Sequence, residues 1–101
     1  MSSEFKRMIE ERRLTRIRAD RNLILKEMRE ADADLAEAKD SFKGSKFKWA
    51  TIQGYYSMFH AARALVYSKG FREKSHHALV VALRCLLAKE LGIRLIEDFE
   101  N

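Results

Sequence analysis

The chain has 101 residues and a net charge of +5, with 47% hydrophobic residues, 35% charged residues, one cysteine and no proline. This length allows one domain, and the apolar content excludes a disordered chain. Cys85 is the one cysteine, so no internal disulfide can form, which fits a protein of a reducing compartment. The longest uncharged stretch, residues 49–62, is shorter than the roughly 20 apolar residues of a membrane span, and the first residues lack the apolar core of a signal peptide, so we expect a cytoplasmic protein.

The first 30 residues are highly charged, with nine basic and six acidic side chains. Apolar residues recur there at helical spacing in two patches, one around Phe5 and Met8 and the other around Leu14, Ile17 and Ile24. This pattern predicts an irregularly amphipathic helix, or a pair of helical pieces, over residues 4–30. We treat residues 1–27 as a charged N-terminal helical extension.

Two clearer helices follow. Apolar residues at steps of three or four from Met28 to Phe42 predict a helix that Gly44 ends. Residues 46–69 then predict a helix with a broad apolar arc, which includes Phe59 and Leu65 and ends at Gly70. A helix with so wide an apolar face must pack against more than one neighbour.

The last part of the chain predicts a further helix and the opening of another. Ser75 is a suitable N-cap, a stripe of leucines and Val80 follows, and Gly92 marks the C-terminus. Residues 95–101 are typical of the first turns of a fifth helix. We therefore predict an all-α, antiparallel up-and-down helical bundle over residues 28–101, and its interior should contain Phe42, Phe59, Leu65 and Leu83.

The polar residues of the helix at residues 46–69 lie on one side. Tyr56, His60, Arg63, Tyr67 and Gln53 fall within about 80° of one another on a helical wheel. A cation, an imidazole and two phenols can stack on a base and pair with phosphate. They can equally form a polar seam between helices, in which each tyrosine buries its ring. Tyr56, His60, Arg63 and Tyr67 are thus the candidate ligand-binding residues.

Residues 49–79 (WATIQGYYSMFHAARALVYSKGFREKSHHAL) resemble the signature of the HEPN domain, the higher eukaryotes and prokaryotes nucleotide-binding family. The resemblance spans roughly residues 28–100 and is greatest for small archaeal and bacterial members. It implies a bundle of antiparallel helices, a tendency to form homodimers, and association with nucleotides or RNA. Some relatives are encoded beside a minimal nucleotidyltransferase, as a toxin–antitoxin pair. The residues that carry the resemblance are Trp49, Ala50, Tyr55, Tyr56, Met58, Phe59, His60, Ala61, Ala62, Ala64, Leu65, Ser68, Lys69, Gly70, Glu73, Lys74, Ser75 and His76.

The same resemblance raises two further expectations. Relatives continue beyond the LIEDFEN-like segment into another helix, so the last helix of the family is expected to be missing here. An apolar strip would then face water unless a second copy covers it. Many HEPN proteins are also metal-independent RNases with an arginine and a histidine separated by four to six residues. Arg72 and His77 match that spacing, although they precede the helix where the family carries the motif.

Residues 46–76 carry six basic side chains and one acidic side chain, which suits nucleic acid, a nucleotide or an acidic protein. A merely solvated face of lysine and arginine is the alternative. His76 and His77 have no carboxylate or cysteine cluster beside them, so we expect neither a metal site nor a cofactor. The sequence thus indicates a HEPN-type module that binds nucleotide, RNA or a nucleotidyltransferase partner. An RNase toxin and a plain protein-interaction module are the alternatives.

Overall fold

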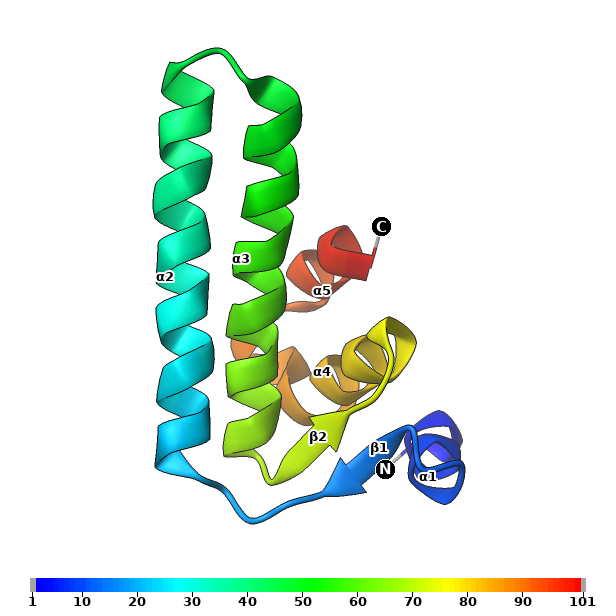
Figure 1. Cartoon of the computed structure of the whole chain (residues 1–101). Coiled ribbons are helices and arrows are strands. Elements are labelled where there is room, and N and C mark those ends of the chain that lie inside the picture. The colour runs from blue at the N-terminus through cyan, green and yellow to red at the C-terminus, as the bar shows by residue number, and fades with distance from the viewer. Residues whose placement is uncertain (1, 101) are drawn as a thin grey trace.

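The computed structural model describes residues 2–100, which form five helices and one pair of short strands. The elements are α1 (Ser3–Glu10), β1 (Leu14–Arg16), α2 (Arg21–Lys43), α3 (Phe47–Ser68), β2 (Phe71–Glu73), α4 (His76–Leu91) and α5 (Ile93–Glu100). Figure 1 shows α2 and α3 as a long antiparallel hairpin, with α1, α4 and α5 gathered on the side of α3 that faces away from α2. The predicted all-α helical bundle is confirmed, and α4 and α5 lie across the hairpin.

The length of the hairpin follows from the sequence. The side chain of Asp20 accepts a hydrogen bond from the N–H of Asn22 at 2.9 Å and so caps the start of α2. No proline interrupts the 23 residues that follow, and Gly44 closes the helix. The predicted helix at residues 46–69 is observed as α3, within one residue at each end. Over residues 2–100, none of the helices combines the length and apolarity needed to cross a bilayer.

The fourth helix begins and ends where the sequence predicts, and the fifth begins at Ile93, two residues before the predicted start. The Ser75 hydroxyl accepts a hydrogen bond from the N–H of Ala78 at 3.0 Å, as an N-cap does. Gly92 closes α4 with φ +83°, a left-handed conformation that favours glycine, and α5 starts at the next residue.

The N-terminal segment differs from the prediction because it contains a strand. Residues 14–16 form β1, which pairs antiparallel with β2 so that Leu14 lies opposite Glu73 and Arg16 opposite Phe71. The hydrogen bond from the Ile17 N–H to the Gly70 carbonyl extends this pairing at 2.9 Å. The boundary expected between residues 27 and 28 falls inside α2, which runs unbroken from Arg21.

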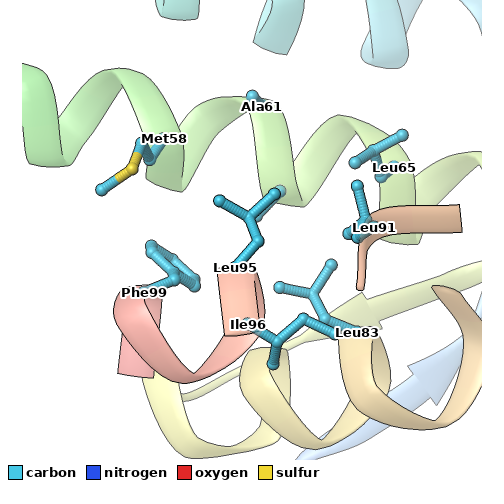
Figure 2. A pocket seen from close by; sticks show the side chains of 9 residues that line it. Met58, Ala61, Leu65, Leu83, Leu91, Leu95, Ile96 and Phe99 are labelled. Atoms are coloured by element: carbon cyan, nitrogen blue, oxygen red, sulfur yellow. The ribbon is translucent and has the colours of Figure 1, made fainter. Parts of the chain in front are cut away.

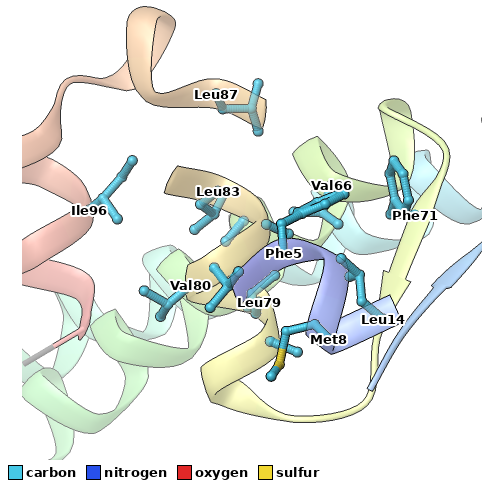
Figure 3. Close-up of a cluster of buried hydrophobic side chains, with 14 of the residues drawn as sticks. Phe5, Met8, Leu14, Val66, Phe71, Leu79, Val80, Leu83, Leu87 and Ile96 are labelled. Atoms are coloured by element: carbon cyan, nitrogen blue, oxygen red, sulfur yellow. The ribbon is translucent and has the colours of Figure 1, made fainter. Parts of the chain in front are cut away.

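The hydrophobic core lies where α1, α4, α5 and the strands meet the second half of α3 (Figure 3). Phe5 and Met8 of α1 are completely buried, and the Phe5 ring packs edge-on against Phe71 with centroids 5.3 Å apart. The buried part of the cluster consists of Phe5, Met8, Leu14, Ala62, Val66, Phe71, Ala78, Leu79, Val80, Val81, Ala82, Leu83, Leu87, Ile96 and Phe99.

One predicted interior residue is on the surface. Phe42 is 64% exposed, because it lies near the end of the hairpin that α4 and α5 do not cover (Figure 1). Leu83 is buried as predicted, and Phe59 and Leu65 are partly buried against the core. The helical periodicity of α2 therefore identified its packing face only in part, because Ala31 and Ala38 are buried whereas Met28 and Leu35 are each 43% exposed.

An apolar groove of about 190 Å³ lies between α3, α4 and α5 (Figure 2). Met58 of α3 and Leu95 of α5 line it and are 45% and 50% exposed. Large apolar side chains thus meet solvent at this groove, as they also do at the closed end of the hairpin.

Candidate nucleic-acid interface

Arg63, in the second half of α3, is enclosed by acidic groups. Its Nη1 lies 3.2 Å from Oε1 of Glu27 on α2, and its Nε donates to Oε1 of Glu73 on β2 at 3.2 Å. A further guanidinium N–H donates to the Tyr67 hydroxyl. Glu27 and Glu73 are only 5% and 9% exposed, so the arginine balances two buried carboxylates and ties α2, α3 and β2 together.

The groups of this cluster keep Arg63 charged and Tyr67 neutral. Burial on its own lowers the pKa of Arg63, but Glu73, Tyr67 and Glu27 outweigh burial, so the pKa is raised and the guanidinium stays charged. Burial raises the pKa of the Tyr67 phenol and Glu73 raises it further, against the opposing effect of Arg63 and Arg72. Tyr67 is completely buried and remains a neutral hydrogen-bonding group.

His60 joins the same cluster one turn earlier on α3. Its Nδ1 lies 2.5 Å from Oε2 of Glu27, and its Nε2 lies 3.7 Å from Oδ2 of Asp34. Tyr56 lies apart, 49% exposed, with its ring edge-on to Tyr55 at 5.6 Å. The structure thus brings three of the four candidate ligand-binding residues into one network around Glu27 and leaves Tyr56 on the surface.

Arg72 and His77, the pair with RNase-like spacing, have different partners. The Arg72 guanidinium lies 5.7 Å from the centre of the Tyr67 ring, on the strand side of the fold. His77 is in the first turn of α4, and its Nε2 lies 3.5 Å from Oε2 of Glu4 on α1. Within residues 2–100, no hydrogen bond or ion pair joins the two side chains.

His76 and His77, which are adjacent in the sequence, contact different helices. Nδ1 of His76 is 3.1 Å from the Tyr55 hydroxyl on α3, whereas His77 faces α1. In the part of the chain that the structure describes, no three histidine, cysteine, aspartate or glutamate side chains gather as a metal site would require.

The strand pair concentrates basic side chains that are distant in the sequence. We use the name basic ribbon for β1, β2 and their flanking residues, with six exposed cations: Arg12, Arg13, Arg16, Arg18, Arg72 and Lys74. The N–H of Lys74 donates to the Arg13 carbonyl at 2.8 Å, so these two residues lie opposite each other. Because side chains alternate along a strand, Arg13, Arg72 and Lys74 share the face of the ribbon away from buried Leu14 and Phe71.

Residues 12–18 and 70–75 contain a single acid, Glu73, and its carboxylate points inward to Arg63. Arg13 also contacts Glu11, at 3.4 Å, outside these segments. Sequence reasoning noted both basic segments but missed their pairing, since a strand of three residues gives almost no alternation to detect. A potential strong enough to attract a polyanion follows from this clustering.

Two long antiparallel helices crossed by shorter helices, with a small strand pair beside them, define a helical module. The HEPN domain family model matches residues 25–101, and the chain belongs to the HEPN family. No curated protein and no protein of known structure matches the chain significantly.

Proposed function

We propose that this HEPN module binds RNA, and that the basic ribbon is the surface that holds the phosphate backbone. The observation that supports this proposal is the pairing of β1 with β2, which gathers six exposed cations, while Glu73, the acid within the two segments, turns inward to Arg63. Phosphate contacts of this kind supply most of the sequence-independent affinity for nucleic acids.

The α3 network has a structural role in this proposal. The donors of Arg63 are engaged by Glu27, Glu73 and Tyr67, so a phosphate would have to displace two carboxylates that are already buried. Displacement would leave Glu73 without a partner and Glu27 with His60 alone, at a cost of several kcal/mol. Of the predicted ligand-binding residues, Tyr56 alone keeps an exposed ring for a base.

The test is the RNA affinity of Arg18→Ala/Lys74→Ala. Both side chains are exposed on the basic ribbon, so the fold should survive. Losing two charge-assisted phosphate contacts should weaken binding by about tenfold or more. The matched control is Lys89→Ala/Arg94→Ala, which removes the same charge from exposed positions on α4 and α5 and should bind as the wild type does.

Equal affinity of the ribbon variant and the wild type would contradict the proposal, as would a wild type that does not bind RNA. If the ribbon instead binds a nucleotidyltransferase partner, the protein should bind that partner and not RNA. Gel analysis of the recovered RNA separates binding from cleavage by Arg72 and His77, and we expect the RNA to be intact.

A further inference from the structure

The closed end of the α2–α3 hairpin carries an unusual set of exposed aromatic side chains. We use the name hairpin tip for Phe42, Phe47 and Trp49 with Lys39, Lys43, Lys46 and Lys48. Phe42, Phe47 and Trp49 are 64%, 57% and 55% exposed, the highest values among the large apolar side chains of residues 2–100. Figure 1 places this end of the hairpin opposite the strand pair, away from the other helices.

The rings are arranged across the turn rather than packed into a core. Phe42 at the end of α2 and Phe47 at the start of α3 lie edge to face, with centroids 5.5 Å apart. Nζ of Lys48 lies 5.8 Å from the centre of the Trp49 ring. An open hollow of about 340 Å³ beside them is lined by Ala38, Lys39, Phe42, Lys43 and Ala50.

The charge of the hairpin tip selects an anionic partner. Residues 39–49 contain four lysines and one acid, Asp40. The cations are interspersed with the rings along the chain, in the order Phe42, Lys43, Lys46, Phe47, Lys48, Trp49. A surface that inserts into a membrane separates its apolar face from its charged face. Interleaved rings and cations instead match a polymer that alternates flat bases with phosphates.

We propose that the hairpin tip stacks unpaired bases of RNA on Phe42, Phe47 and Trp49, while its lysines contact the neighbouring phosphates. Aromatic stacking is available only to bases that are not paired in a duplex, so the tip gives the module a preference for single strands. This inference rests on the proposed RNA binding and adds a second contact at the opposite end of the hairpin from the basic ribbon.

Trp49 is the only tryptophan of the chain and therefore reports on the hairpin tip by its fluorescence. The probe is a short unpaired oligoribonucleotide, compared with the same sequence annealed into a duplex. We expect the single strand to quench Trp49 and the duplex to leave it nearly unchanged. Phe42→Ala/Phe47→Ala, which keeps the reporter, should bind the single strand about tenfold or more weakly and the duplex unchanged.

Met28→Ala/Leu35→Ala is the matched control, since both side chains are exposed on α2 away from the tip, each at 43%. It should bind both RNAs as the wild type does. The ribbon variant Arg18→Ala/Lys74→Ala should weaken single strand and duplex alike, because both present phosphates.

Three results would overturn the tip inference. If the ribbon variant weakens RNA binding while Trp49 stays silent and the tip variant binds normally, the proposed function stands and the tip inference fails. If the wild type binds no RNA, both fail. If RNA leaves Trp49 unchanged while anionic phospholipid vesicles shift its emission to shorter wavelength, the tip is a membrane-contact surface instead.

Discussion

At the scale of single residues, the polar stripe of α3 illustrates how one set of side chains suits two roles. Arginine, histidine and tyrosine at helical spacing fit a nucleotide site and a polar seam equally well. The partner residues distinguish the two. Glu27 comes from the preceding helix and Glu73 from the following strand, and both are buried against Arg63. This arrangement makes the stripe part of the structure that joins the hairpin to the rest of the fold.

Arg63→Ala should therefore destabilise the protein strongly. It leaves the Glu73 carboxylate unpaired and Glu27 with His60 alone, and breaking a buried pair in this way typically costs about 3–5 kcal/mol. Urea denaturation gives the change in the free energy of unfolding. Arg84→Ala is the control, because Arg84 and Glu100 form a pair whose side chains are each 39% exposed, and its loss should cost less than about 1 kcal/mol. If Arg63→Ala were as stable as the wild type but bound RNA more weakly, Arg63 would be a ligand-binding residue.

Tyr67 predicts a loss of stability at alkaline pH. Its pKa is raised in the folded state by burial and by Glu73, whereas in the unfolded chain it has the ordinary value of about 10. Below about pH 10 the Tyr67 phenol is protonated in both the folded and the unfolded chain, so its contribution to the stability of the fold is fully present. As pH rises beyond that value the unfolded chain releases a proton that the folded chain still holds, so stability falls.

Denaturation of Tyr67→Phe across this pH range measures the effect. The variant has no phenol to ionise, so its stability should fall less steeply with rising pH than that of the wild type. Tyr56→Phe, at an exposed position, should keep the wild-type slope. Parallel curves for Tyr67→Phe and wild type would show that the Tyr67 phenol does not contribute.

At the scale of elements, α1 is an integral part of the core. Phe5 is completely buried and packs on Phe71 of β2, so Phe5→Ala should cost about 3–5 kcal/mol in the free energy of unfolding. Phe47→Ala removes the same ring from a 57% exposed site and should cost less than about 1 kcal/mol. Thermal or urea denaturation of the two variants compares them directly. A small cost for Phe5→Ala would show that α1 is not part of the core.

The sequence predicts helices well where periodicity and caps agree. Ser75 and Gly92 mark the two ends of α4. Gly44 and Gly70 follow the ends of the two long helices, α2 and α3. These signals can be found in the sequence because they act locally. The strand pair could not be predicted, since β1 and β2 are three residues each and their pairing joins residues more than 50 positions apart. The partners of Arg63 were missed because they lie on α2 and β2, and the periodicity of α3 carries no information about the elements that pack against it. Phe42 shows a different limit, because α2 extends beyond the core and periodicity alone does not show where the core ends.

At the scale of the whole molecule, the groove between α3, α4 and α5 suits self-association. Met58 and Leu95 expose apolar surface around a cavity that contains no charged side chain among its lining residues (Figure 2). We propose a two-fold dimer through this groove. Light scattering at micromolar concentration should give about twice the chain mass, and Leu95→Glu should give the mass of one chain. Leu35→Glu, on α2, should remain dimeric. A monomeric wild type would contradict the proposed dimer.

The salt dependence of RNA affinity tests the role of the basic ribbon most directly. The logarithm of the binding constant should fall with the logarithm of salt concentration, and if all six cations neutralise phosphates of a single strand, the ribbon contributes about −4 to that slope. Arg18→Ala/Lys74→Ala removes two of the six, so the contribution of the ribbon should change to about −3 and the whole slope should be shallower by about 1. A variant with the wild-type slope would show that the phosphates lie elsewhere and would contradict the account of the basic ribbon.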